Sequence, residues 1–389
     1  MYKKLLLTLI LCTFLLTPSY AQENPRLGVW ITVFSPEEVL ASRSNVDKLI
    51  ETCKKCGIND VYIQVYRADK AYYDSDITDK TPYENIVRTK SGDTLKYLIE
   101  KAASGNISIH AWINVLSLAQ NKEANIIRKY GDEIITIDQH SRTSLHAGEK
   151  DDLDKYYIRE NQLFLEPGDW RVRKYIYDIS KEIVRKYPGL SGLHLDYIRY
   201  PAAVPFVPGA RFPSHGISYG YTGVNLENFK NATGLNAKEM PYARENFKLW
   251  DDWRRKQLTT LLGGISKEVR SISPNIKISC TIVASVERTY LVTFQDWTKW
   301  LANGLIDYVV AMDYTDDTRL FMMNAESLLF SEFKDEVQIG VGAYLLNENP
   351  DVLKDQIGSL DRINPAGIVI FSYDDIAGSE EIQEYLSKL

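Results

Sequence analysis

The hydrophobic and polar positions of this chain follow two alternating patterns over most of its length. Short apolar runs rich in β-branched residues, typical of buried strands, are separated by stretches with the spacing of amphipathic helices. The predicted strands are Leu27–Val33, Asp60–Val65, Ser108–Val115, Gly192–Ile198, Lys277–Val283, Tyr308–Tyr314, Val337–Ala343 and Gly367–Tyr373. The predicted helices are Val46–Cys56, Thr94–Ala103, Trp170–Tyr187, Tyr242–Ser271, Trp297–Asn303, Ala325–Phe333, Asp351–Leu360 and Glu380–Leu389.

This alternation predicts an α/β fold in which parallel strands are joined by right-handed helical crossovers. Eight such units predict a closed (β/α)8 TIM barrel. The chain has 389 residues, more than the ~250 typical of that barrel, so long insertions are expected after the third and fourth strands. They are Ser117–Asn161 and Pro201–Pro241, and the second, which lacks either period, is predicted to be a loop that forms an ordered lid. The alternative is an open doubly wound sheet, but no Gly-rich phosphate turn follows the first strand.

The first 21 residues have the features of a secretory signal peptide. Lys3 and Lys4 precede the apolar run Leu5–Leu16, and Ser19–Ala21 is a small-x-small cleavage signal. We therefore expect an exported protein, periplasmic or extracellular, whose residues 22–389 form one catalytic domain. An uncleaved N-terminal anchor is the alternative. No later segment reaches the ~18 apolar residues of a spanning helix, so no stable membrane insertion is expected.

Composition narrows the classes of partner. The chain has 46 basic and 52 acidic residues, a net charge of −6, which argues against a nucleic-acid partner. Aromatic residues make up 11% of the chain, and aromatic rings suit ligands with apolar faces and polar rims, sugars among them. No cofactor is predicted, and the oligomeric state is not indicated. Cys53 and Cys56 fit a strained disulfide, a redox pair or two core thiols, of which core thiols are favoured.

Polar and aromatic residues gather at the predicted strand ends, where a TIM barrel has its active site. His110, Trp112 and Asn114 alternate along the third strand and therefore point to the same side, and His194 and Asp196 do so along the fourth. Barrel interiors are normally filled by apolar side chains, so buried polar groups need partners or a ligand. A polar network that only orders the barrel is the alternative.

Several collinear segments resemble the glycosyl-hydrolase-like family 10 barrels of exported bacterial proteins. They are Leu27–Ile31, Val61–Val65 with Ala71–Tyr73, His110–Asn114, Leu165–Gly168 with Val172–Arg173, Gly192–Pro201, Asp252–Arg255, Gly304–Val310 and Gly367–Tyr373. The resemblance implies a (β/α)8 carbohydrate-active barrel that cleaves glycosidic bonds in a polysaccharide or cell-wall glycan. The chain departs from the family pattern at Tyr197, where a second Asp is common, at Glu166, where Asn is common, and at Arg67, which is displaced by one position.

Glycoside hydrolysis normally uses two carboxyl groups. Asp196 ends the fourth strand and matches the family Asp, so it is the first predicted catalytic residue. Glu166 is its predicted partner, just before the helix that starts near Asp169 and so on the loop after the third strand, beside the fourth. The alternatives for the second carboxyl group are Asp313, Asp374 and Glu287, although parity turns Asp313 away from the barrel axis.

The predicted substrate-binding residues are aromatic, amide, imidazole or charged. They are Trp30, Gln64, Arg67, His110, Trp112, Asn114, His194, Arg199, Asp313, Tyr314 and Tyr373. Arg199 fits either a clamp for a substrate carboxylate or an ion pair with an acid at the barrel top. Two other functions remain open: a carbohydrate-binding barrel that has lost its second carboxylate, and a metal hydrolase that uses His110, His194 and Asp196.

Overall fold

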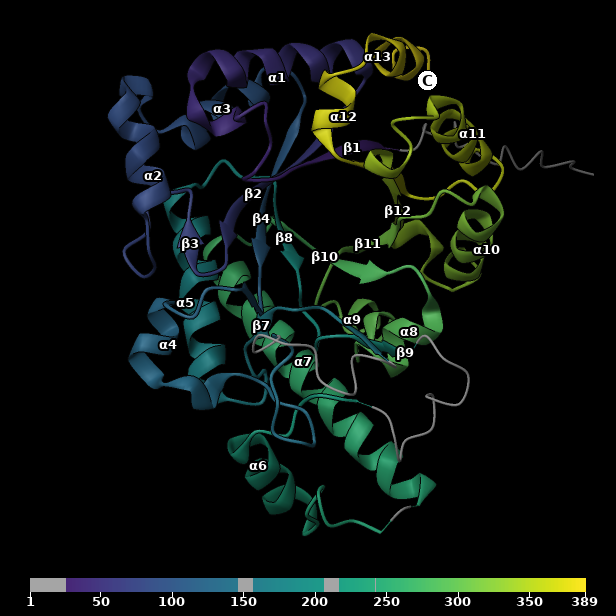
Figure 1. The fold of residues 1–389 in the computed structure, drawn as a ribbon. Coiled ribbons are helices and arrows are strands. Elements are labelled where there is room, and N and C mark those ends of the chain that lie inside the picture. The colour runs from purple at the N-terminus through teal and green to yellow at the C-terminus, as the bar shows by residue number, and fades with distance from the viewer. Residues whose placement is uncertain (1–25, 146–156, 206–216, 242) are drawn as a thin grey trace, which may run out of the picture.

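Eight parallel strands close into a barrel, which confirms the predicted (β/α)8 fold (Figure 1). The computed structural model describes residues 26–145, 157–205, 217–241 and 243–389, so the predicted signal peptide lies outside it. Around the barrel the strands are β1 (Arg26–Ile31), β2 (Asp60–Arg67), β4 (Ser108–Asn114), β8 (Gly192–Asp196), β10 (Lys277–Val283), β11 (Tyr308–Asp313), β12 (Val337–Gly342) and β13 (Gly367–Phe371). β1 pairs with both β2 and β13, which closes the ring.

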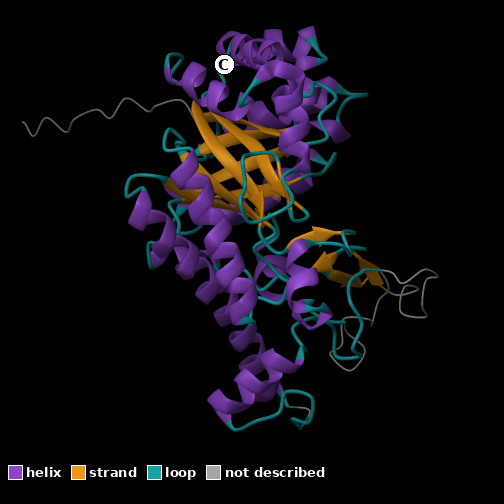
Figure 2. Ribbon diagram, turned by 90° about the vertical axis from the view of Figure 1, so that its left-hand side faces the viewer, coloured by secondary structure: helices purple, strands orange, loops and turns teal. Residues whose placement is uncertain are grey.

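Helices surround the strands (Figure 2). They include α1 (Arg43–Cys56), α2 (Thr81–Ile86), α3 (Thr94–Ala103), α5 (Trp170–Lys186), α7 (Arg244–Ile272), α8 (Val286–Leu291), α9 (Trp297–Ala302), α10 (Thr318–Leu329), α11 (Pro350–Leu360), α12 (Tyr373–Ala377) and α13 (Glu380–Leu386). α10 starts earlier than predicted because the Asp317 side chain caps it, accepting from the N–H groups of Arg319 and Leu320. Within the described ranges, every helix falls short of the length and apolarity that crossing a bilayer requires.

Short elements occupy the two regions that were expected to be insertions. After β4 the chain forms β5 (Ser117–Ala119), α4 (Asn125–Tyr130), β6 (Tyr157–Arg159) and β7 (Leu163–Phe164), and after β8 it forms β9 (Ala203–Pro205) and α6 (Gly223–Thr233). The prediction of a loop throughout Pro201–Pro241 was therefore wrong at α6, which Thr222 caps and Gly234 ends in a left-handed conformation. Residues 206–216 lie outside the described part of the chain, so the lid stays a prediction.

The barrel separates two apolar cores. The larger core lies between the strands and the helices and includes Cys53 and Cys56, which are free and fully buried as expected of core thiols. The smaller core fills the barrel interior with Trp30, Tyr62, Trp112, Val310 and Val369. The alternation of side chains along each strand produces this division, because successive residues point to opposite faces.

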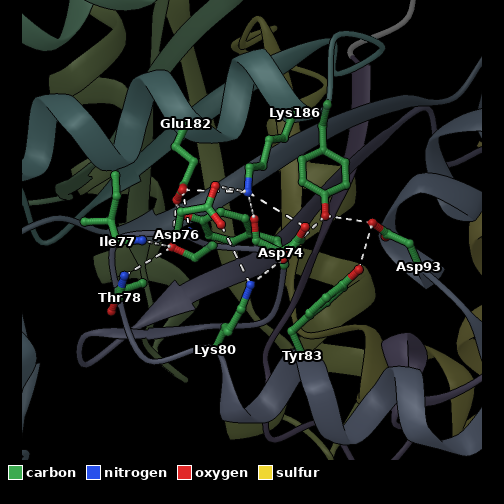
Figure 3. A network of polar contacts seen from close by, with 12 residues as sticks. Asp74, Asp76, Ile77, Thr78, Lys80, Tyr83, Asp93, Glu182 and Lys186 are labelled. Atoms are coloured by element: carbon green, nitrogen blue, oxygen red, sulfur yellow. Dashed lines mark hydrogen bonds and ion pairs between the residues drawn. The ribbon is translucent and has the colours of Figure 1, made fainter.

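A polar network fixes the segment that follows β3 (Lys70–Ala71), the antiparallel strand beside β2 (Figure 3). The buried carboxylate of Glu182 on α5 accepts hydrogen bonds from the Tyr73 hydroxyl (2.8 Å), the Ser75 hydroxyl (2.7 Å) and the Asp76 backbone N–H (2.6 Å). Lys186, one turn further along α5, pairs with the Asp76 carboxylate at 2.7 Å. The network therefore attaches the segment after β3 to α5 in the outer layer of helices.

Candidate functional site

A cavity of about 260 Å³ opens at the carboxyl ends of the barrel strands. Its lining comes from nearly every strand or the residues that directly follow one. The lining residues are Trp30, Thr32, Phe34, Gln64, Arg67, Trp112, Asn114, Asp196, Tyr197, Arg199, Thr281, Met312, Tyr314 and Phe371. The cavity therefore brings together Trp30, Gln64, Arg67, Trp112, Asn114, Asp196, Arg199 and Tyr314 of the predicted site.

Asp196 is the chemically distinctive residue of this cavity. It ends β8 and is 5% exposed. Its Oδ1 atom accepts hydrogen bonds from the Thr281 hydroxyl (2.6 Å) and the Tyr197 backbone N–H (2.7 Å). Among the described residues that line the cavity, Asp196 alone carries a carboxyl group.

The surroundings of Asp196 favour its protonated form. Burial raises the pKa of this carboxyl group, and the Thr281 hydroxyl, the positive charge of Arg199 and the Tyr197 N–H only partly oppose the rise. The nearby indole N–H of Trp112 also lowers this pKa slightly, although it does not meet the geometric criteria for a hydrogen bond to Asp196. A carboxyl group with a raised pKa at the mouth of a barrel is suited to act as a general acid.

The two sides of the cavity differ in character. β2, β4, β8 and the residues just after them supply every charged and amide side chain of the lining, and the Gln64 amide donates to Asn114 Oδ1 at 3.0 Å. The opposite side, from β11, β13, β1 and the residues just after them, is mainly aromatic, with Thr32 and Met312 beside its four rings. There the rings of Tyr314 and Phe371 stack at a centroid distance of 5.5 Å. One polar and one aromatic wall match the hydroxyl rim and the apolar face of a sugar ring.

Arg199 and Arg67 are the two cations of the lining, and they are held differently. Arg199 forms a bidentate ion pair with Glu160, at 2.5 and 3.0 Å, so its acid partner comes from the region after β4. Arg67 lies over the Phe34 ring at 4.4 Å and forms no ion pair with any described residue. Arg67 is therefore the cation that can bind an anionic or hydroxyl group of a ligand.

His110 lies deeper in the barrel than the cavity, which corrects its prediction as a substrate-binding residue. Its Nε2 atom bonds Asp60 Oδ1 at 2.9 Å, and Arg26 pairs with the other carboxylate oxygen of Asp60. The Nδ1 atom of His110 faces the Tyr308 hydroxyl at 3.3 Å. Gly192 on the next strand leaves room for the imidazole, because an added Cβ would lie 2.1 Å from its Nδ1 atom. These groups form a closed polar cluster at the barrel base.

His194 also lies below the cavity, contrary to its prediction. It is fully buried, its Nε2 atom accepts from the Trp30 indole N–H at 3.1 Å, and its Nδ1 atom bonds the Ser279 hydroxyl at 2.8 Å. Burial, and then the charge of His110, hold the pKa of His194 well below its usual value. The metal-hydrolase alternative needs His110, His194 and Asp196 together, whereas both imidazoles are committed elsewhere and the described residues contain no three-ligand group of this kind.

Glu166 is fully buried and is not among the described residues that line the cavity. Its carboxylate accepts from the hydroxyl groups of Thr136 and Tyr200, both at 2.9 Å, and from the Gly168 N–H at 3.1 Å. Burial raises its pKa. These bonds tie Glu166, which follows β7, to Thr136, to Tyr200 after β8 and to Gly168 before α5, so the placement supports a structural role rather than the predicted partnership with Asp196.

The other predicted residues also lie outside the cavity lining. Asp313 faces α10, where Asn324 donates to it at 2.8 Å, and burial raises its pKa to about 7. Tyr373 begins α12 and belongs to the outer core, because β13 ends two residues earlier at Phe371. Asp374 accepts from the Ser35 hydroxyl, and Glu287 is exposed on α8.

Sequence reasoning missed some residues of the site. Thr281 has the inward parity of β10 and binds Asp196, and Phe371 takes the aromatic position that was assigned to Tyr373. Strand parity could have identified Thr281. An earlier end to the last strand could have identified Phe371. Glu160, which holds Arg199, lies in an aperiodic region and gave no such signal.

The closed barrel, with its cavity at the carboxyl ends of the strands, makes this chain a (β/α)8 TIM-barrel protein. The chain belongs to the glycosyl hydrolase-like 10 family, whose model matches residues 26–352. It is 24% identical over 385 residues to glycosyl hydrolase YngK of Bacillus subtilis (strain 168), with 90% of this chain and 67% of that protein covered. It is 23% identical over 337 residues to glycosyl hydrolase DigH of Escherichia coli (strain K12), with 76% and 67% covered.

Solved structures of low sequence identity share the fold. The catalytic domain of a β-amylase from Paenibacillus polymyxa has a TM-score of 0.56 and 12% identity, and the match covers 93% of this chain and 98% of that one. Gan42B, a GH42 β-galactosidase, has a TM-score of 0.58 and 11% identity, with 94% and 56% covered. At these identities the likeness is one of fold alone.

Proposed function

We propose that this chain is an exported glycoside hydrolase that cleaves glycosidic bonds in a polysaccharide or cell-wall glycan, with Asp196 as its general acid. The observation that carries the proposal is the position of Asp196. It lies buried at the carboxyl end of β8, with a raised pKa, in a cavity that has an aromatic wall. The names of the relatives YngK and DigH support the same class of reaction.

In this proposal a sugar ring packs against Tyr314 and Phe371, and its glycosidic oxygen faces Asp196. The protonated carboxyl group donates its proton to the leaving oxygen as the C–O bond breaks, and a water molecule adds to the anomeric carbon. The added water releases a proton to solvent, and Asp196 takes a proton back from solvent before the next turnover. Thr281 and the Tyr197 N–H hold Oδ1, so the carboxylate left after proton transfer remains oriented and stabilised. Gln64 and Asn114 supply hydrogen bonds to hydroxyl groups of the sugar.

A carbohydrate-binding barrel without hydrolytic activity is the second candidate function. It is favoured by one observation, namely that Asp196 is the single carboxyl group among the described residues of the cavity lining. Hydrolysis with two carboxyl groups places them within ~10 Å of each other. Both candidate functions require glycan binding in the cavity, and only the first includes cleavage of the bound glycan.

The test is to offer the purified protein a panel of peptidoglycan-derived and plant glycans and to measure both binding and sugar release. Asp196→Asn is expected to bind the same glycan and to lose activity by about 10²–10⁴-fold, the usual contribution of a general acid. Glu100→Gln, at an exposed position on α3 outside the cavity lining, is the control and should keep full activity. Equal sugar release by Asp196→Asn and the unaltered protein would remove Asp196 from the chemistry, and binding without release would favour the second candidate.

Export is part of the proposal and has its own test. Cleavage after Ala21 would make Gln22 the first residue of the mature protein. N-terminal sequencing of the protein recovered outside the cytoplasm is expected to begin at Gln22. A mature protein that still begins at Met1 would contradict cleavage.

A further inference from the structure

An exposed aromatic residue continues the aromatic wall of the cavity outward. Tyr344 lies in the short 3₁₀ helix η6 (Ala343–Leu345), directly after β12, and is 46% exposed. It is not among the residues that line the cavity. It nevertheless contacts two that are, with ring centroids 6.0 Å from Tyr314 and 5.8 Å from Phe371.

The position of the Tyr344 ring is fixed by these contacts. It meets Tyr314 at an interplanar angle of 87° and Phe371 at 82°, so both contacts are edge-to-face. Gly342 allows Tyr314 to pack closely, because a Cβ added there would lie 3.1 Å from Tyr314 Cβ. β12 lies between β11 and β13 in the barrel, so the three rings come from adjacent strands. An aromatic ring held in place in this way loses little conformational entropy when a ligand binds.

The size of the cavity leaves the rest of a polymeric ligand outside it. Ligand pockets usually measure ~300–1,000 Å³, and this cavity measures about 260 Å³. A cavity of this size holds only a small part of a glycan chain. Tyr344, which contacts Tyr314 and is 46% exposed, is therefore placed to contact the next sugar ring outside the cavity.

We propose that Tyr344 forms an outer sugar-binding subsite, which binds the ring next to the one in the cavity and makes affinity depend on glycan length. The inference rests on the proposed function, because it takes the ligand to be a glycan. It assigns to Tyr344 a binding role and no part in the proton transfer.

The test measures the affinity of the inactive Asp196→Asn protein for oligosaccharides of increasing length, so that turnover does not interfere. The probes are N-acetylglucosamine and its chitooligosaccharides, and peptide-free peptidoglycan fragments, each series running from monosaccharide through disaccharide to tetrasaccharide. Addition of Tyr344→Ala is expected to lower affinity for the longer oligosaccharides by about 2- to 12-fold, the equivalent of an aromatic contact of ~0.5–1.5 kcal/mol. It should leave affinity for the monosaccharide, which fills the cavity alone, unchanged.

Two matched variants control this experiment. Tyr344→Phe keeps the ring and should keep the length dependence, whereas Phe330→Ala removes an aromatic side chain that is 95% exposed just after α10 and should change nothing. Equal loss of affinity at every length, or no loss at any length, would overturn the outer subsite while leaving the proposed function intact. Absence of binding by the parent protein to every glycan, together with absence of sugar release, would overturn the proposed function and the subsite with it.

Discussion

The base and the top of this barrel both hold polar residues inside an otherwise apolar interior, yet they are organised in different ways. At the base, Asp60 is bonded by both His110 and Arg26, and the Tyr62 hydroxyl reaches Tyr308 and Gln338. The polar groups there satisfy one another. At the top, Asp196 and Arg67 face a cavity. The comparison teaches that buried polar residues mark a functional site only where their bonding capacity is left open to a ligand.

We expect the greatest loss of protein stability from a change in the polar cluster at the base of the barrel. Asp60→Ala would leave His110 and Arg26 without their shared carboxylate, and loss of one member of a buried ionic cluster typically costs about 3–5 kcal/mol. We expect the free energy of unfolding, measured with urea, to fall by about this amount. The activity per folded molecule should stay the same. Lost activity with unchanged stability would mean that the base belongs to the active site.

A matched pair of arginines sharpens the comparison. Arg67→Ala at the top should raise KM by about 10- to 100-fold, because a hydrogen bond to a charged group contributes ~1.5–3 kcal/mol, and should change stability by less than ~0.5 kcal/mol. Arg26→Ala at the base should affect stability and not KM. It should lower the free energy of unfolding by about 1 kcal/mol, a small loss because the Arg26 side chain is 50% exposed and solvent weakens its ion pair. Steady-state kinetics and urea unfolding of both variants test this contrast. If both variants changed KM alike, or stability alike, the separation of a binding top from a structural base would be contradicted.

Smaller, opposite effects of pH are expected from the two aspartates. Burial alone would raise the pKa of Asp60, but His110 and Arg26 outweigh it and lower that pKa. Its ionised form therefore stabilises the fold above the unfolded pKa of ~3.9, and this contribution is lost as pH falls through the lower folded pKa. The pKa of Asp196 is raised instead. Its contribution is fully present below ~3.9 and is lost as pH rises through the folded pKa.

Urea unfolding across the acidic and neutral range checks these signs. Relative to the unaltered protein, Asp60→Asn should be most destabilised at neutral pH and less so at low pH. Asp196→Asn should gain relative stability as pH rises. If the stability difference between variant and unaltered protein changed with pH in the same direction for both variants, the opposite pKa shifts assigned to Asp60 and Asp196 would be contradicted. The activity of the unaltered protein should also fall as pH rises through the pKa of Asp196, because the protonated form is the acid.

The sequence predicted much of this architecture because strand parity is local information. The two-residue period turned Trp112, Asn114 and Asp196 to the cavity side of their strands and turned Asp313 away from it, as the structure has them. Parity does not fix depth along the barrel axis, which depends on how far neighbouring strands are staggered. His110 and Trp112 share a side, yet only Trp112 reaches the cavity.

The remaining errors have a different origin. Tyr373 was assigned to the site because the last strand was drawn too long, and Phe371 holds that position instead. Glu166 and Glu160 lie where the sequence has no period. There the path of the chain, and so the partner of each carboxylate, is set by tertiary contacts with Tyr200 and Arg199 rather than by local pattern.

The central claim is that the cavity at the top of the barrel binds the glycan with its scissile bond at Asp196. The most direct measurement is a crystal structure of the Asp196→Asn protein with an oligosaccharide that the unaltered protein cleaves. We expect a sugar ring against Tyr314 and Phe371, with a glycosidic oxygen within hydrogen-bond distance of the side chain at position 196. A glycan bound elsewhere on the molecule, with this cavity empty, would contradict it.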